Sequence, residues 1–160
     1  MNDLPLFLLD APGGGRVGLA PMPGRFAGLE EDVRTLADAG TTLLLSMTTA
    51  LELTPGLAET CTGHGIAWRH LPISDWGTPP IDVREAWPEA SADAHARLDA
   101  GQTVIAHCAG GRGRSGMAVM RLMVERGADP TETFLAIRAI RPGAVETHEQ
   151  RQWAAEGGAR

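Results

Sequence analysis

The ten residues 107–116 read HCAGGRGRSG, and they are the most informative stretch of the chain. They follow the run Thr103–His107, which has the length of a buried strand, and they precede Met117–Val124, which is apolar on nearly every side. A strand, a glycine-rich turn and a buried helix in this order place the turn at the N-terminus of the helix. Backbone N–H groups and the helix dipole favour an anion there. The stretch therefore predicts an anion-binding loop at the edge of a sheet.

Three side chains of this stretch carry chemistry. Cys108 ends the strand, and we expect its thiol to lose its proton readily beside inward-turned N–H groups and a helix N-terminus. Arg114 can hold two oxygens of a phosphoryl group bidentately, and the Ser115 hydroxyl can donate to the Cys108 sulfur. We therefore predict a catalytic set in which Cys108 is the nucleophile. The residues expected to bind the substrate are Ala109, Gly110, Gly111, Arg112, Gly113 and Arg114.

Residues 111–116 also fit the dinucleotide-binding pattern G-x-G-x-x-G. That fingerprint requires a parallel strand after the helix, ending in an acidic residue for the ribose. Here the next segment begins with Asp129-Pro130, which predicts a second helix. Residues 13–18 fit the same pattern with no helix behind them. We therefore interpret the loop as a site for a reacting anion and not for a dinucleotide.

Strands alternate with helices along the chain. The expected strands are Leu6–Asp10, Arg16–Ala20, Thr42–Met47, Ile66–Ile73 and Thr103–His107, the first of them within an apolar run that begins at Leu4. The expected helices run from Leu29 to Gly40, from an N-cap at Thr54-Pro55 to Gly63, through the stripe Trp87–Leu98 to Gly101, from Ser115 to Arg126, and from caps at Asp129 and Thr147. This alternation predicts an α/β fold with a central mixed, mostly parallel sheet flanked by helices.

Length and composition limit the classes of protein that fit. A chain of 160 residues with 43% hydrophobic and 21% charged residues is typical of one soluble globular domain, here predicted over residues 1–160. All 14 basic residues are arginine, and 20 acidic residues give a net charge of −6, which disfavours nucleic acid and anionic membranes as partners. The apolar run near the start is too short to span a membrane. The two cysteines, Cys61 and Cys108, are too few for a disulfide scaffold or a structural zinc site, so we expect a reducing cytoplasm.

Phosphoryl hydrolysis also needs an acid that protonates the leaving oxygen and then a base that activates water. Residues 72–80 read PISDWGTPP, which cannot continue a strand or a helix and must form a loop. Asp75 lies in this loop just past a predicted strand. It is our candidate for the general acid and base.

Cys108, five intervening residues, Arg114 and Ser115, with His107 in front, resemble the signature of the protein tyrosine phosphatase superfamily. The Asp75 loop is similar to the general-acid loop of its small dual-specificity members. Further similarities lie in residues 23–25, the helix from Leu29 to Gly40, the strand Leu43–Leu45 with Glu52-Leu53 after it, and residues 141–150. Together they cover nearly the whole chain and resemble the kinase-associated-phosphatase, or cyclin-dependent-kinase-inhibitor-3-like, type.

The resemblance implies a cysteine-based phosphatase fold and hydrolysis through a phosphocysteine intermediate. It implies phosphotyrosine in a protein or peptide as the substrate, leaves phosphoserine and phosphothreonine open, and implies no metal or organic cofactor. It also implies that Gln150 lies near the site, where its amide could orient the hydrolytic water. Gln150 is equally the third residue of a capping box with Thr147, so both roles stay open.

Other readings also stay open. Arg112 lies where the lipid-phosphatase branch carries a basic residue for inositol phosphates, but Ala109 is not the second basic residue of that branch. A module that binds phosphate without catalysis would use the same loop. Cys61 could form a protective disulfide with Cys108 or could be a plain core residue. The sequence says nothing about the oligomeric state.

Overall fold

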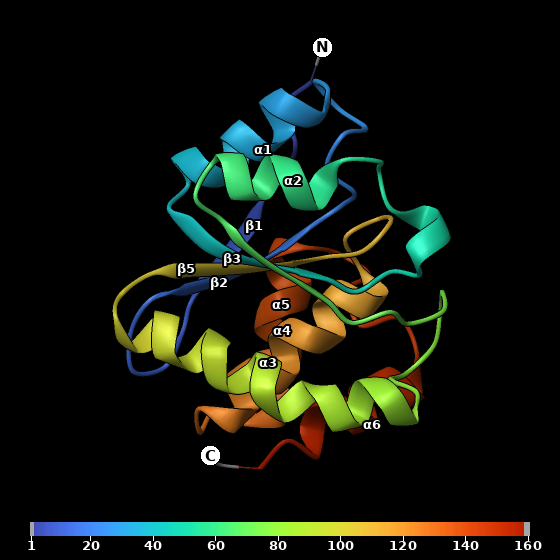
Figure 1. Ribbon diagram of the computed structural model, residues 1–160. Helices are drawn as coiled ribbons and strands as arrows, with labels where there is room; N and C mark the ends of the chain where they lie inside the picture. The colour runs from blue at the N-terminus through green and yellow to red at the C-terminus, as the bar shows by residue number, and fades with distance from the viewer. Residues whose placement is uncertain (1, 159–160) are drawn as a thin grey trace.

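The computed structural model describes residues 2–158, and its centre is a five-stranded sheet (Figure 1). The strands are β1 (Phe7–Asp10), β2 (Arg16–Ala20), β3 (Thr41–Ser46), β4 (Ala67–His70) and β5 (Thr103–His107). Their order across the sheet is β1-β2-β5-β3-β4, and β1 is antiparallel to β2 whereas the other pairs are parallel. The predicted mixed, mostly parallel sheet is confirmed, and β5 is its middle strand.

Helices cover both faces of this sheet. They are α1 (Leu29–Asp38), the short 3₁₀ helix η1 (Ala50–Glu52), α2 (Leu57–Gly63), α3 (Ile81–Asp99), α4 (Gly113–Glu125), α5 (Pro130–Ile140) and α6 (His148–Ala155). Figure 1 shows α1 and α2 on one face and α3, α4, α5 and α6 on the other. The result is the three-layer α/β arrangement that the alternation of strands and helices predicts.

The two faces of β5 pack against different parts of the core. Val104 and Ala106 belong to the larger hydrophobic cluster beneath α3 to α6, whereas Ile105 belongs to the smaller cluster beneath α1 and α2. This division follows from the alternation of side chains along a strand. Because β5 is buried on both faces, its C-terminal end is held firmly, and the loop after it starts from a fixed point.

The two N-terminal strands form the predicted hairpin, with Phe7 opposite Leu19. Gly15 in the connection has φ 71°, and a Cβ there would lie 2.5 Å from the Gln102 carbonyl oxygen, so the close approach requires glycine. The strand begins at Phe7, so the apolar residues from Leu4 to Leu6 precede it.

The predicted start of α2 is wrong. The Thr54 hydroxyl does not cap a helix but donates to the Pro23 carbonyl at 2.6 Å, and Gly56, with φ 85°, is the residue before the first helical turn. Leu57 and Cys61 are both buried on the inner face of α2, as predicted. The strand predicted over Ile66–Ile73 pairs only over Ala67–His70.

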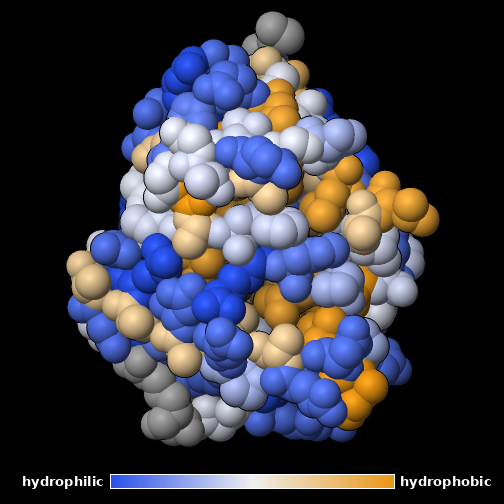
Figure 2. Space-filling model, viewed as in Figure 1, coloured by the Kyte–Doolittle hydropathy of each residue, from blue (hydrophilic) through white to orange (hydrophobic). Residues whose placement is uncertain are grey.

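Some hydrophobic surface remains outside the core. Among residues 2–158, the large hydrophobic side chains that are most exposed are Leu51, Trp76, Ile81 and Leu135. Figure 2 shows hydrophobic atoms gathered at the right edge of the molecule, where the short helix η1 lies in Figure 1. Within the described part of the chain, no helix is long and apolar enough to cross a membrane.

Candidate active site

The loop between β5 and α4 turns its carbonyl groups outward. The carbonyl oxygens of residues 109–112 accept hydrogen bonds from the backbone of Met22 and of Val145, each at 3.1 Å, and from the Arg141 guanidinium at 2.7 and 3.2 Å. The backbone N–H groups of the same four residues have no acceptor within residues 2–158. Four donors are therefore left for an anion held inside the loop, as an anion-binding loop requires.

Glycine is required at one position of this loop. Gly111 has φ 71°, and a Cβ on it would lie 2.7 Å from the Pro21 backbone nitrogen. Gly113, which begins α4, packs against the carboxyl end of the Glu146 side chain. The small residues of the loop therefore serve close packing as well as backbone freedom.

Cys108 lies at the base of the loop and is 3% exposed. Its sulfur lies 3.2 Å from the Ser115 hydroxyl, the contact that the sequence predicts. Its backbone N–H donates to the Ala20 carbonyl at 3.3 Å, which continues the β2–β5 pairing into the loop. Helix α4 begins at Gly113, so the thiol faces the positive end of the helix dipole.

The buried His107 shapes the loop through a chain of hydrogen bonds. Its Nδ1 lies 3.0 Å from the Cys108 carbonyl oxygen, and its Nε2 lies 2.6 Å from the Ser46 hydroxyl, which accepts from the Trp68 indole at 2.7 Å. Burial lowers the pKa of His107 to about 4, so the ring is neutral at pH 7. A neutral ring satisfies these contacts in one way only: Nδ1–H donates to the carbonyl, and Nε2 accepts from Ser46.

Arg114 is the largest fully buried side chain among the described residues. Its two terminal nitrogens donate to the two carboxylate oxygens of Glu52 at 2.8 and 2.9 Å, and one of them also donates to the Ile73 carbonyl at 2.8 Å. Its third nitrogen, Nε, carries an N–H that is buried and has no partner among the described residues. A buried donor without an acceptor is costly, so this N–H marks where a ligand oxygen belongs.

Glu52 is a site residue that the sequence interpretation left without a role. Its pKa falls to about 2, chiefly because of its hydrogen bonds to Arg114, so it is ionised at neutral pH. Burial alone would lower the pKa of Arg114, but the Glu52 bonds and the nearby Cys108 outweigh that effect and raise it. The pair fixes the guanidinium in place and keeps it charged.

Asp75 reaches the site from the predicted loop after β4. Its Oδ1 lies 3.6 Å from the Arg114 guanidinium and accepts the backbone N–H of Trp76 at 3.0 Å. The loop turns sharply, because the Gly77 N–H donates to the Ser74 carbonyl at 2.9 Å. The Asp75 side chain is 58% exposed, so it lies at the mouth of the site rather than in its base.

Gln150 is buried next to this loop, and it does form the predicted capping box. Its side-chain oxygen accepts the backbone N–H groups of Glu146 and Thr147 at 2.9 and 3.2 Å. Its side-chain nitrogen donates to the Gly77 carbonyl at 3.1 Å. Gln150 thus joins the Asp75 loop to α6, and a single N–H of its amide is left without a described partner.

The rim of the loop carries further charged groups. Glu146, also without an assigned role in the sequence interpretation, accepts the Gly113 N–H, and its pKa is raised first by burial and then by Asp75. Arg112 is exposed and lies near Arg141, whose pKa is lowered by burial and by Arg112. The site therefore combines a positive rim with two carboxyl groups.

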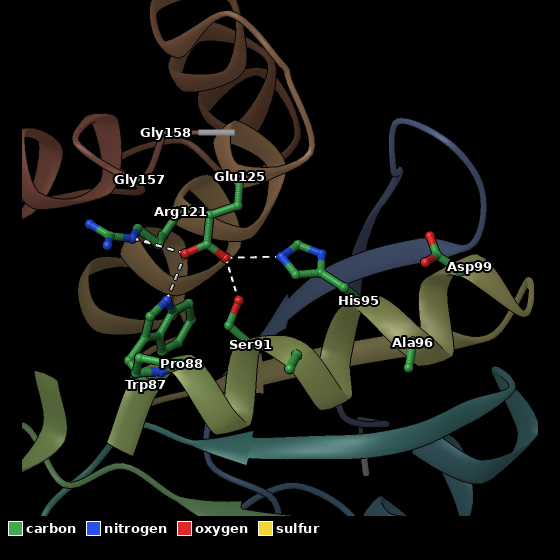
Figure 3. A pocket seen from close by; sticks show the side chains of 11 residues that line it. Trp87, Pro88, Ser91, His95, Ala96, Asp99, Arg121, Glu125, Gly157 and Gly158 are labelled. Carbon is green, nitrogen blue, oxygen red and sulfur yellow. Dashed lines mark hydrogen bonds and ion pairs between the residues drawn. The ribbon is translucent and has the colours of Figure 1, made fainter. Parts of the chain in front are cut away.

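A separate cavity of about 460 Å³ lies between α3 and α4, away from Cys108. Figure 3 shows Trp87, Ser91, His95 and Arg121 directed at the carboxylate of Glu125. All four donate to it, and these hydrogen bonds outweigh burial and lower the pKa of Glu125. The polar groups of this cavity are satisfied by one another, so they fasten α3 to the helix that begins at the loop.

No group of three or more His, Cys, Asp or Glu side chains within residues 2–158 is arranged to hold a metal ion. Both cysteines are free thiols. Burial raises the pKa of Cys61 to about 11, so this thiol is protonated and unreactive at neutral pH.

Comparison with known proteins agrees with this geometry. The family model described as "Swiss Army Knife protein, DSP-PTPase phosphatase domain" matches residues 22–154. Mouse cyclin-dependent kinase inhibitor 3 is 29% identical over 145 residues, which cover 84% of this chain and 67% of that protein.

Solved structures agree as well. A structure of kinase associated phosphatase superimposes with a TM-score of 0.83 at 23% identity, over 98% of this chain and 94% of that one. The active form of Tk-PTP superimposes with a TM-score of 0.73 at 31% identity, over 91% and 92% of the two chains. The chain therefore belongs to the DSP-PTPase phosphatase domain family, and it is a small cysteine-based protein phosphatase of the dual-specificity, cyclin-dependent-kinase-inhibitor-3-like type.

Proposed function

We propose that this enzyme hydrolyses phosphotyrosine, with phosphoserine and phosphothreonine as further substrates, in proteins or peptides of a reducing cytoplasm. The observation that supports the proposal best is the group of unpaired donors around Cys108. Four backbone N–H groups of the loop after Cys108 and the Nε–H of Arg114, in the first turn of α4, lack acceptors. A phosphoryl group has oxygens that accept from such donors and a phosphorus atom that a thiolate can attack.

In the first step, the Cys108 thiolate forms an S–P bond while the P–O bond of the ester breaks. Arg114 and the loop N–H groups bind the three equatorial oxygens, whose negative charge is redistributed in the transition state. Asp75 gives its proton to the departing oxygen. The product alcohol or phenol leaves, and a phosphocysteine remains.

In the second step, a water molecule attacks phosphorus while the S–P bond breaks. Asp75, now a carboxylate, takes the proton of that water. The Ser115 hydroxyl, 3.2 Å from the sulfur, donates to the thiolate as it leaves. The amide N–H of Gln150 that has no described partner supports the predicted role in holding the water, while the rest of that amide positions the Asp75 loop.

Phosphate release from p-nitrophenyl phosphate and from phosphotyrosine, phosphoserine and phosphothreonine peptides tests this function. We expect turnover by the wild type at pH 5–7, inhibition by vanadate, no effect of chelators, and no turnover by Cys108→Ser. Asp75→Ala should retain a bound phosphopeptide that the wild type releases. Full turnover by Cys108→Ser would overturn the proposal, and so would phosphopeptide binding by the wild type without any phosphate release. Faster release from soluble inositol phosphates than from every peptide would place the substrate in the lipid class instead.

A further inference from the structure

Two exposed hydrophobic residues are next in sequence to the two carboxylates that contact Arg114. Leu51 precedes Glu52, which binds both terminal nitrogens of Arg114, and Trp76 follows Asp75, which lies 3.6 Å from the same guanidinium. The two segments therefore meet at one group, and each carries an exposed apolar side chain next in sequence to the residue that contacts this group. Leu51 is 101% exposed and Trp76 is 60% exposed, so neither side chain is used to build the core.

The backbone of Trp76 is held in an unusual conformation. Its φ is 64°, in the left-handed region that glycine and asparagine favour and that bulky residues avoid. Hydrogen bonds within residues 74–77 and the bond from Gln150 to the Gly77 carbonyl impose this conformation. Strain of this kind persists where the surroundings over-determine it, and here the strained residue gains little packing in return. The position directs a large aromatic ring outward beside the general acid.

The surface near the loop has two kinds of side chain. Arg112 and Arg141 supply positive charge close to the loop, whereas Figure 2 shows that the surface over η1 is hydrophobic. A substrate whose phosphate enters the loop brings its neighbouring residues near the two segments that carry Leu51 and Trp76. Apolar side chains lose the most contact with water at such a surface.

We propose that Leu51 and Trp76 form a substrate-binding rim that selects phosphopeptides with aliphatic or aromatic residues next to the phosphorylated one. This inference rests on the proposed function and names the substrate class that the same site takes. Leu51 and Trp76 contact the substrate only outside the phosphoryl group, so they determine specificity and take no part in the bond-breaking steps.

Paired phosphotyrosine peptides test the rim. The two peptides differ only in the residues beside phosphotyrosine, which are leucine and phenylalanine in one and serine in the other. We expect the wild type to favour the apolar peptide at least tenfold in kcat/KM, chiefly through KM, because one apolar contact contributes about 10–200-fold to discrimination. Leu51→Ala and Trp76→Asn should each reduce this ratio about tenfold. Trp76→Phe keeps an aromatic ring and should keep the ratio of the wild type. Asparagine accepts the left-handed backbone, so Trp76→Asn removes the ring without disturbing the turn.

Leu135→Ala is the matched control, because Leu135 is also 60% exposed but lies on α5. Its peptide ratio should equal that of the wild type. Equal kcat/KM for the two peptides in the wild type would overturn the rim and leave the phosphatase function standing, whereas failure on both peptides and on p-nitrophenyl phosphate would overturn the function itself. A rim variant that slows both peptides equally, or a self-association that Leu51→Ala abolishes, would also overturn the rim.

Discussion

Replacing Glu52 by glutamine tests whether its carboxylate holds Arg114 in place. Glutamine has the same shape but no charge, and it offers one acceptor oxygen where the carboxylate offers two. The pKa of Glu52 falls from 4.5 to about 2 on folding, chiefly through its bonds to Arg114. At about 1.4 kcal/mol for each pH unit, this difference corresponds to about 3 kcal/mol of stability. Solvent screens part of it, because the side chain is 27% exposed, so we expect Glu52→Gln to lose about 2 kcal/mol.

The dependence on pH identifies the cause. A carboxyl group with a lowered pKa stabilises the folded protein fully above its unfolded value of 4.5, and this stabilisation is lost as the pH falls toward about 2. Urea unfolding of the wild type and Glu52→Gln at pH 7, 5, 4 and 3 should therefore show a difference that is largest at pH 7 and shrinks below pH 4.5. Glu59→Gln, at an exposed position on α2, should match the wild type throughout.

Two results would refute this reasoning. One is equal stability of the wild type and Glu52→Gln at pH 7. The other is a difference that stays constant as the pH falls, which would show that the missing acceptor oxygen, and not the missing charge, causes the loss of stability. Glu52→Gln should also lower kcat/KM on p-nitrophenyl phosphate, because Arg114 is then free to leave the position that meets the phosphoryl oxygens.

Three further substitutions give equally definite expectations. Asp75→Asn should lower kcat by about 10²–10⁴-fold on alkyl phosphates such as phosphoserine peptides, measured by phosphate release, and a loss below threefold would exclude Asp75 as the acid. Glu125→Ala leaves four donors without this acceptor, one of them the half-buried Arg121, so urea unfolding should show a loss of about 3–5 kcal/mol, and an unchanged midpoint would contradict the role assigned to this cluster. Glu146→Gln should stabilise the protein at pH 7 and not at pH 4, because the raised pKa of Glu146 gives stability below 4.5 that is lost as the pH rises. Identical stability of wild type and Glu146→Gln at both pH values would contradict the raised pKa.

The catalytic loop was predictable because its determinants are local. Ten consecutive residues contain the thiol, the guanidinium, the hydroxyl and the glycines, and a strand before and a helix after them set their relative positions. The same holds for the helix start at Thr147, where a capping box needs only four residues. Asp75 was identifiable because its loop cannot form regular structure.

Glu52 was not assigned because its role depends on a contact across 62 positions of the chain. Strands β3 and β5 pair side by side in the sheet, so the segments after them leave the same edge, and that neighbourhood is absent from any short stretch of sequence. One local signal was available: Thr49 and Glu52 have capping-box spacing, which predicts a helical turn at η1.

The start of α2 was predicted wrongly for the opposite reason, because a local signal was present and a distant contact overrode it. Thr54-Pro55 matches the local pattern of a helix N-terminus, but the Thr54 hydroxyl finds a closer partner in the Pro23 carbonyl, 31 positions away. Local preference predicts a cap only where no distant group competes for the same hydroxyl. The order of the strands was equally beyond local reasoning, because it depends on which helices cover which face.

The bond from Gln150 to the Gly77 carbonyl has a consequence for the rate of turnover. It fastens the segment that carries Asp75 to α6 before any substrate arrives. If this bond is kept in the substrate complex, the general acid that we propose needs no closing motion before each catalytic cycle. Steady-state turnover should then be insensitive to the viscosity of the medium, because no diffusive motion of this segment would limit it.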